Sequence, residues 1–308
     1  MSAKVVICEC FARDGLQHET VTISTEEKIS LIDAFSEAGF PRIEATSYSS
    51  PAHVPAFADA SQVLAGIRKR PGSSYKATCP NPKAVQRAIA DAEAGHGADE
   101  ISLLVSATES HTQRNLRTTR EAQWANVAEM VDLAAGRFRL IGVISMALGC
   151  PFEGKVDPSV VLADLARFAE LGVNHVSVCD TTGHGTPGSV HGLFARITRE
   201  LPQVTAIAHF HDSRGTALAN CFAAYEAGCR WFDSAMGGVG GHPTQITYGD
   251  GYTGNVATED LVNLFETEGI DTGLDLENLR QASRLCETIL GRQLLSRVAR
   301  SGYGHFAA

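Results

Sequence analysis

Apolar and polar positions follow two different periods along this chain. Short runs rich in β-branched residues, typical of buried strands, recur eight times. They occupy residues 5–10, 43–46, 75–79, 100–105, 140–146, 175–180, 205–211 and 231–236. Between them, apolar residues recur every three or four positions, as on one face of a helix. The clearest helix is predicted over 26–38, between the capping box Ser24-x-x-Glu27 and the C-terminal Gly39.

Further helices are expected at 83–94, 120–135, 158–171, 187–201, 217–227 and 258–265. Strands that alternate with helices predict an α/β protein with a parallel sheet. Eight such units favour a closed (β/α)8 TIM barrel over an open doubly wound sheet, which usually has about five or six strands. Arg13-Asp14-Gly15 also stands where the open sheet would carry a glycine-rich phosphate loop. We expect residues 1–274 to form the barrel and residues 275–308 a C-terminal helical extension packed on it.

Composition narrows the class of protein. With 308 residues, 44% of them hydrophobic, the chain can bury a large core. Its net charge of -9 argues against nucleic acid or an anionic membrane as a partner. The longest basic cluster, Arg68-Lys69-Arg70, is interpreted as a solvated helix end. Eight cysteines without a CxxC pair, and no apolar stretch of about 18 residues, predict a cytoplasmic protein with reduced thiols.

The strongest chemical signal is His209-Phe210-His211, at the end of the seventh predicted strand. A two-residue spacing in a strand sends both imidazoles to the same side, where they can share a divalent metal. The alternative interpretation is that both are polar side chains on a solvated sheet face. The polar residues at the ends of the other predicted strands distinguish between these two interpretations.

Polar residues gather just beyond several of the predicted strands, where barrel enzymes place their chemistry. They are Arg13, Asp14 and Gln17 after the first strand, Glu44 and Thr46 at the second, Asp180 and Thr181 at the sixth, and His242 and Asn255 beyond the eighth. Each has a structural alternative: an Arg13–Glu44 ion pair could merely close the barrel top, and Asp14 or Asp180 could cap a turn or helix. One active site explains all of these positions together. An aspartate carboxylate and the two histidines, with Asn255 as a neutral oxygen donor, would suit Mg²⁺, Mn²⁺ or Zn²⁺.

Five sequence blocks together resemble the hydroxymethylglutaryl-CoA (HMG-CoA) lyase family, which belongs to a barrel superfamily of metal-dependent lyases and synthases. The blocks cover nearly the whole chain: Arg13-Asp14-Gly15-Leu16-Gln17-x-Glu19, Ile43-Glu44-Ala45-Thr46-Ser47, Ala147-Leu148-Gly149-Cys150-Pro151-Phe152-Glu153-Gly154, His209-x-His211-Asp212, and Gly254-Asn255-x-Ala257-Thr258-Glu259-Asp260.

The resemblance implies a role for each matching residue. The implied metal ligands are Asp14, His209, His211 and Asn255. Arg13 would stabilise an enolate oxygen, and Glu44 and Asp180 would take part in positioning and proton transfer. We assign Gln17 and Thr46 to substrate binding. A retro-Claisen cleavage needs a Lewis acid at the hydroxyl and a cation at the thioester carbonyl, and this set of residues supplies both.

One position departs from the family. HMG-CoA lyases carry a catalytic cysteine in a Gly-rich loop after the eighth strand, whereas here the loop reads Gly238-Val239-Gly240-Gly241-His242-Pro243. Histidine can exchange protons near neutral pH, so His242 is a candidate catalytic residue; the alternative is a loop histidine without a role in proton transfer. Because the loop closes over the acyl group, we hypothesise a substrate such as citramalyl-CoA in place of HMG-CoA.

Two different functions would also be compatible with these blocks. The first is an acetyl-CoA-dependent synthase that condenses a 2-oxo acid; such synthases commonly carry long C-terminal domains, whereas only residues 256–308 follow Asn255 here. The second is a non-catalytic barrel subunit, which would be expected to have lost metal ligands. The resemblance also implies an acyl-CoA substrate and a homo-oligomer. Candidates for the CoA phosphates are Arg114, Arg117, Arg120 and Lys155, and His53 and His184 are candidates to line the site.

Overall fold

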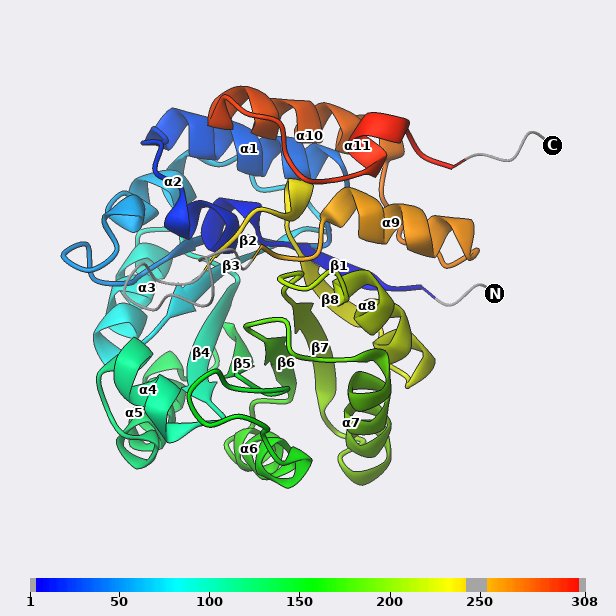
Figure 1. Cartoon of the computed structure of the whole chain (residues 1–308). Helices are drawn as coiled ribbons and strands as arrows, with labels where there is room; N and C mark the ends of the chain where they lie inside the picture. The colour runs from blue at the N-terminus through cyan, green and yellow to red at the C-terminus, as the bar shows by residue number, and fades with distance from the viewer. Residues whose placement is uncertain (1–3, 242–253, 305–308) are drawn as a thin grey trace.

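The structure, a computed structural model, describes residues 4–241 and 254–304, in which eight parallel strands close a barrel in chain order (Figure 1). The strands are β1 (Val6–Glu9), β2 (Arg42–Ser47), β3 (Ser74–Cys79), β4 (Glu100–Ser106), β5 (Arg139–Ser145), β6 (His175–Asp180), β7 (Thr205–Phe210) and β8 (Trp231–Ser234). Pairing of β1 with β8, from Val6 opposite Trp231 to Glu9 opposite Ser234, closes the ring. The predicted (β/α)8 barrel is confirmed, and every strand end lies within two residues of its prediction.

Helices surround the barrel as an outer layer (Figure 1). They are α1 (Thr25–Glu37), α2 (Ala60–Gly66), α3 (Pro82–Glu93), α4 (Glu109–Leu116), α5 (Arg120–Ala134), α6 (Pro158–Glu170), α7 (Pro187–Glu200), α8 (Ala217–Glu226), α9 (Thr258–Thr267), α10 (Leu276–Leu290) and α11 (Val298–Ser301). Helix α4 was not predicted, and α2 was expected only as the unnamed helix that would end at Arg68-Lys69-Arg70; it ends at Gly66, just before that cluster. Both are short, and α4 is almost entirely polar in sequence, so it lacks the apolar period by which a helix is recognised.

Local sequence accounts for α1. The Ser24 hydroxyl accepts from the Glu27 backbone N–H at 3.2 Å, and the Glu27 carboxylate accepts from the Ser24 N–H at 2.7 Å, so the predicted capping box is present. Gly39 follows the helix with a φ of 88°, a left-handed conformation that glycine adopts without steric cost.

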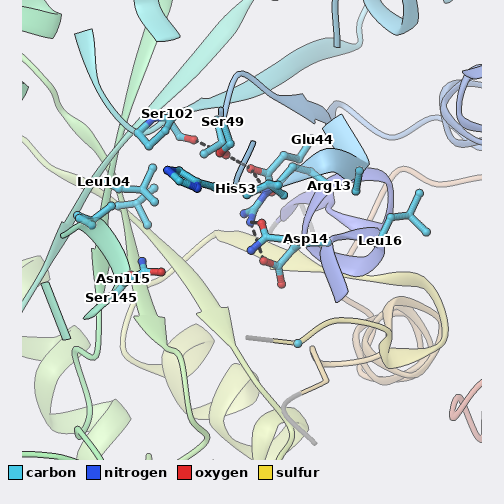
Figure 2. Close-up of a pocket in the computed structure, with 18 of the residues that line it drawn as sticks. Arg13, Asp14, Leu16, Glu44, Ser49, His53, Ser102, Leu104, Asn115 and Ser145 are labelled. Carbon is cyan, nitrogen blue, oxygen red and sulfur yellow. Dashed lines mark hydrogen bonds and ion pairs between the residues drawn. The ribbon is translucent and has the colours of Figure 1, made fainter. Parts of the chain in front are cut away.

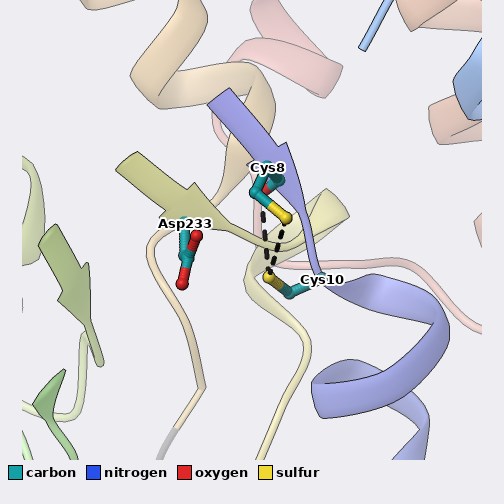
Figure 3. Close-up of side chains that lie close together, drawn as sticks. All are labelled: Cys8, Cys10 and Asp233. Carbon is teal, nitrogen blue, oxygen red and sulfur yellow. Dashed lines mark hydrogen bonds between the residues drawn. The ribbon is translucent and has the colours of Figure 1, made fainter. Parts of the chain in front are cut away.

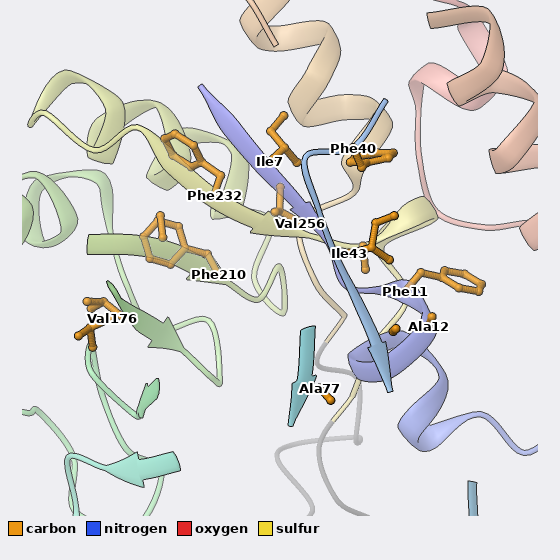
Figure 4. Close-up of a cluster of buried hydrophobic side chains, with 14 of the residues drawn as sticks. Ile7, Phe11, Ala12, Phe40, Ile43, Ala77, Val176, Phe210, Phe232 and Val256 are labelled. Carbon is orange, nitrogen blue, oxygen red and sulfur yellow. The ribbon is translucent and has the colours of Figure 1, made fainter. Parts of the chain in front are cut away.

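Buried apolar side chains fill the space between the strands and the helices (Figure 4). Phe35 of α1 packs edge to face on Phe11, with ring centroids 6.0 Å apart. Both rings are fully buried, and burial of such a side chain stabilises a fold by roughly 1.5–3 kcal/mol. This packing fixes the segment after β1, from which site residues project.

The C-terminal segment completes the outer layer. Helix α10 contacts α1 on one side and α9 on the other, and it buries Leu279, Ala282 and Cys286. Helix α10 therefore belongs to the outer layer of helices. A division of the chain into residues 1–274 and 275–308 stays a prediction.

The structure can be compared with two expectations from composition, on the cysteines and on membrane-spanning helices. All eight cysteines are buried and free, in agreement with the prediction of reduced thiols. Over the described ranges, no helix is both long enough and apolar enough to cross a bilayer.

Candidate active site

Three charged or titratable side chains meet above the barrel, within 4.8 Å of one another: Asp14, His209 and His211. Asp14 lies in a π-helical turn, Phe11–Gly15, directly after β1. The two imidazoles come from the end of β7, and their Nε2 atoms lie 3.3 Å apart. His211 Nε2 is 3.9 Å from Asp14 Oδ2. All three side chains are buried, so they form a preorganised set of nitrogen and oxygen donors.

Asn255 completes this group from the segment after β8. Its amide nitrogen donates to Asp14 Oδ2 at 2.6 Å and to the Val239 carbonyl at 3.0 Å. Its Oδ1 is buried and has no hydrogen-bond partner among the described residues. A buried oxygen of this kind needs an electrophile or a donor, and amide oxygens are ligands of hard divalent cations. The four residues therefore fit a divalent metal.

Asp233 of β8 was not predicted as a site residue, although its carboxylate contacts His209. Its Oδ2 lies 3.2 Å from His209 Nδ1, so the Nδ1–H donates to the carboxylate and Nε2 is left to face the site. Parallel pairing places His209 directly opposite Asp233. In the sequence, the feature that could have identified Asp233 is its position as a charged residue within an apolar strand next to the strand of His209 and His211.

Electrostatics keep both carboxylates ionised. Burial alone would raise the pKa of Asp14, but the Arg13 charge and both histidines lower that pKa below its usual value. Burial also opposes ionisation of Asp233, yet Lys76 and the contact with His209 lower the pKa of Asp233. The Asp14 carboxylate beside the two imidazoles and the Asp233 carboxylate beside His209 are thus both anionic across the physiological pH range.

Arg13 links this group to Glu44 of β2. Its Nε lies 2.7 Å from Glu44 Oε1, and its Nη1 donates to Asp14 Oδ1 at 2.7 Å. Glu44 also accepts from the Thr78 hydroxyl at 2.7 Å and has Lys76 at 3.6 Å. Arg13 and Glu44 both line the main cavity, so the ion pair forms part of its wall.

The cavity holds about 910 Å³ and opens between the ends of the strands (Figure 2). Asp14, His209, His211 and Asp233 line it, and so does Gln17, whose Oε1 lies 3.5 Å from Arg13 Nη1. Thr46, the other predicted substrate-binding residue, is buried and is not among the cavity-lining residues. The pairing of β2 with β3 shifts register between Glu44 and Thr46, which breaks the alternation that would have put them on one face.

Asp180 ends β6 as predicted, but its carboxylate binds its own loop. Oδ1 accepts from the His184 N–H at 2.8 Å, and Oδ2 accepts from the Gly185 N–H at 2.7 Å. Asp180 is not among the cavity-lining residues, whereas its neighbour Thr181 is. This geometry is that of the structural alternative, a carboxylate that caps a turn; a role in proton transfer stays a prediction.

Comparison with known proteins identifies the scaffold. The profile of the HMGL-like family matches residues 4–286. The chain belongs to this family. A mitochondrial HMG-CoA lyase of Rattus norvegicus is 40% identical over 97% of this chain and 89% of its own. A 3-hydroxy-3-isohexenylglutaryl-CoA/hydroxy-methylglutaryl-CoA lyase of Pseudomonas aeruginosa is 37% identical over 97% of both chains.

Solved structures agree with this assignment. An HMG-CoA lyase of Acinetobacter baumannii, in complex with coenzyme A and 3-methylmalate, superposes with a TM-score of 0.92 and 36% identity, covering 100% of this chain and 99% of that one. The HMGL-like chain described here is a carbon–carbon lyase of the HMG-CoA lyase type.

His242, which stands where the family motif has a cysteine, lies outside the described residues. Gly241, the residue before it, lines the cavity. The other loop histidines differ: His53 lines the cavity, whereas His184 is not among its lining residues and contacts the Thr182 hydroxyl at 2.6 Å.

Of the four candidate cations for the CoA phosphates, two line the cavity and two do not. Arg120 pairs with Asp164 at 2.8 Å, and neither Arg120 nor Lys155 is among the cavity-lining residues. Arg114 and Arg117 do line the cavity. Binding of a CoA phosphate by any of the four stays a prediction.

A second group of potential metal donors is made up of Cys8, Cys10 and Asp233 (Figure 3). The two sulfur atoms are 3.9 Å apart. However, Arg42 Nη1 and Lys76 Nζ lie 3.5 Å and 3.9 Å from Asp233. These side-chain cations already balance the carboxylate, and burial raises the pKa of the Cys10 thiol. This cluster therefore fits a neutral-thiol packing layer better than a metal site.

Proposed function

We propose that this chain is a divalent-metal-dependent lyase that cleaves HMG-CoA into acetyl-CoA and acetoacetate. The observation that carries the proposal is the buried Oδ1 of Asn255, which has no described hydrogen-bond partner beside Asp14 and the two histidines. Those donors share one cavity with the Arg13 guanidinium. Relatives that carry this activity in their names match along nearly their full length, which also supports it.

Asp14, His209, His211 and Asn255 would hold the metal. Two imidazoles with two oxygen donors suit Mg²⁺ or Mn²⁺, with Zn²⁺ as the alternative. When bound, the metal acts as a Lewis acid that acidifies the substrate hydroxyl. Asp233 holds the His209 ring in the tautomer that presents Nε2 to the site.

The remaining chemistry falls to the side chains around the metal. The C3 hydroxyl must lose its proton while the C2–C3 bond breaks, and the electron pair passes to the thioester as an enolate. We assign the stabilisation of that enolate oxygen to the Arg13 guanidinium, which Glu44 orients through the 2.7 Å ion pair. C2 must then gain a proton to become the methyl group of acetyl-CoA. We assign that donation to His242, and we retain Asp180 as a candidate for proton transfer.

A citramalyl-CoA lyase, which would release acetyl-CoA and pyruvate, is the second candidate function. His242 in place of the family's loop cysteine is the observation that favours it. The deciding experiment offers HMG-CoA and both enantiomers of citramalyl-CoA with Mg²⁺ or Mn²⁺ and measures acetoacetate and pyruvate. Acetoacetate alone supports the first function and pyruvate alone supports the second. Inactivity on all three substrates would contradict both.

Two further arms of this assay test for synthase activity and for metal dependence. Release of free CoA from acetyl-CoA and a 2-oxo acid would indicate a synthase. Activity that EDTA abolishes and Mn²⁺ restores would support metal dependence, and activity unaffected by EDTA and exhaustive dialysis would contradict it.

We also propose that the protein acts in the cytoplasm as a homo-oligomer. Free, buried cysteines fit a reducing compartment. Light scattering coupled to size exclusion measures the oligomeric state directly, and a mass equal to one chain would contradict the second proposal.

A further inference from the structure

Lys76 of β3 places a buried positive charge between two carboxylates of the site. Parallel pairing puts Lys76 directly opposite Glu44 of β2. Its Nζ lies 3.6 Å from Glu44 Oε2 and 3.9 Å from Asp233 Oδ2. A side chain of β3 reaches β8 through the interior of the barrel, where bulky apolar side chains are usual and a lysine is not. One buried ammonium therefore contacts carboxylates on two different strands.

Each of the two carboxylates supports a different part of the site. Glu44 holds the Arg13 guanidinium through the 2.7 Å ion pair. Asp233 holds the His209 ring through the 3.2 Å contact with Nδ1. Lys76 is thus linked through one carboxylate to Arg13 and through the other to a candidate metal ligand, and it lines the same cavity as both.

Both carboxylates keep one buried oxygen that accepts no hydrogen bond among the described residues: Glu44 Oε2 and Asp233 Oδ1. Arg42 Nη1 lies 3.5 Å from Asp233 Oδ1, but this guanidinium is already engaged by Glu100 at 2.8 Å. Lys76 approaches the two carboxylates as an ion and not as a hydrogen-bond donor. Its contribution to both is therefore its charge.

Lys76 keeps this charge in its buried position. Burial lowers the pKa of the ammonium, but Asp233 and Glu44 raise that pKa above its usual value. Removal of one partner from a buried ion pair is strongly destabilising, because an uncompensated charge stays behind. A lysine, unlike a metal ion, cannot dissociate from the site. The two carboxylates therefore have a permanent counter-charge.

We propose that Lys76 is a positioning residue that compensates Glu44 and Asp233 in the metal-free protein and, as a like charge near the metal, lowers the affinity of the site for divalent cations. This inference rests on the metal dependence in the proposed function. Two cations that face the same buried carboxylates repel each other, and salt screens buried charges only weakly. The site is thus formed before the metal arrives, and the metal remains exchangeable.

Calorimetric titration with Mn²⁺ tests the sign of this effect. Lys76→Gln removes the charge and keeps a polar side chain, whereas Lys76→Arg keeps the charge. We expect Lys76→Gln to bind Mn²⁺ about tenfold more tightly than the wild type, because a repulsion is lost. Lys76→Arg should stay within about threefold of the wild type. A side chain with a merely structural role would weaken binding when it is replaced, so the direction of the change separates the two roles.

Thermal unfolding with and without Mn²⁺ measures the other half of the same coupling. Metal-free Lys76→Gln should have a lower Tm than the metal-free wild type, because two buried carboxylates have lost a counter-charge. Mn²⁺ should then raise the Tm of the variant by more than that of the wild type. If the metal-free variant does not fold, recovery on refolding with Mn²⁺ supports the inference, and failure to fold under both conditions overturns it.

Lys28 provides the matched control. It is also a buried lysine that lines the cavity. Its Nζ pairs with Asp59 at 2.8 Å and donates to the Ala56 carbonyl at 2.6 Å, and neither partner belongs to the candidate metal site. Lys28→Gln removes the same charge from the same cavity. It should leave the affinity for Mn²⁺ within about twofold of the wild type.

Two outcomes would overturn the inference alone. One is a wild type that binds Mn²⁺ and a Lys76→Gln variant that binds it equally or more weakly. The other is equal tightening by Lys28→Gln, which would reduce the effect to the net charge of the cavity. A wild type that binds Mn²⁺ but cleaves no HMG-CoA would contradict the proposed function alone. Absence of Mn²⁺ binding from the wild type and Lys76→Gln alike would contradict both.

Discussion

Asp233 holds the imidazole of His209 through a 3.2 Å contact between Oδ2 and Nδ1. The same carboxylate oxygen accepts from the Ser177 hydroxyl at 3.2 Å. The aspartate thus fixes the tautomer of a candidate metal ligand while remaining outside the ligand set itself.

Asp233→Asn should weaken metal binding. The amide cannot supply the negative charge that stabilises the His209 N–H, and such outer partners are typically worth about 10–100-fold in metal affinity. Titration with Mn²⁺, followed by calorimetry, measures the change. Ser177→Ala is the control, because it removes one hydrogen bond to Asp233 without touching His209. Equal affinities in Asp233→Asn and the wild type would show that the contact does not support the metal.

Arg13→Lys should lower kcat with little change in KM. The guanidinium contacts Asp14 and Glu44 together at 2.7 Å each, and a single ammonium cannot bridge both and also face the cavity. Loss of an oxyanion-stabilising donor typically costs about 10²–10³ in rate. Steady-state kinetics with HMG-CoA gives both constants. A rise in KM at constant kcat would instead indicate a role in substrate binding alone.

These positions show how far the sequence predicts the site. The His209-x-His211 spacing, the strand ends and the capping box of α1 follow from periodicity and local chemistry, and the structure has them where expected. Asp233 could not be recognised in the same way, because it becomes a partner of His209 only through the register of β7 with β8. The register between two strands depends on the packing of the whole barrel, so no local sequence pattern predicts it.

Thr46 and Asp180 illustrate a second limit. Both lie at strand ends, where polar residues were expected to face one mouth. The position of a residue along a strand does not determine where its side chain points once a register shift or a tight loop intervenes. The shift after Glu44 separates Thr46 from the cavity wall, and the loop after β6 takes both carboxylate oxygens of Asp180.

Asp180→Asn should lower thermal stability together with activity. One of the two oxygens that accept backbone N–H groups would become a donor, and an unsatisfied buried amide costs about 1–3 kcal/mol. Differential scanning calorimetry and turnover measured on the same sample separate the two effects. Lost turnover at an unchanged Tm would favour the proton-transfer role that remains a prediction for Asp180.

Glu9 should make the wild-type protein less stable as the pH rises. Burial raises the pKa of Glu9 to about 8, against partly offsetting hydrogen bonds from Thr258 and the Met236 and Phe11 N–H groups. The folded protein therefore holds this proton more tightly than the unfolded chain. Its stabilising contribution is complete below the unfolded pKa of about 4.5 and is lost as the pH rises through about 8.

Glu9→Gln isolates this effect because it resembles the protonated side chain. We expect the free energy of unfolding of the variant, measured with urea, to rise relative to that of the wild type between pH 5.5 and pH 8. The rise is at most about 1.4 kcal/mol per pH unit. A constant difference between the two proteins at both pH values would mean that Glu9 does not titrate in this range.

The bond between Asn255 and Asp14 has a consequence for biosynthesis. Asp14 leaves the ribosome early, but its partner and both histidines follow only after most of the chain has been made. The complete site therefore cannot form on a nascent chain that lacks the segment after β8, and a chain that reaches this segment also contains β8, the strand that pairs with β1 to close the ring. A cation captured there would favour the completed ring over every shorter intermediate, so the supply of metal during synthesis should influence the yield of native protein.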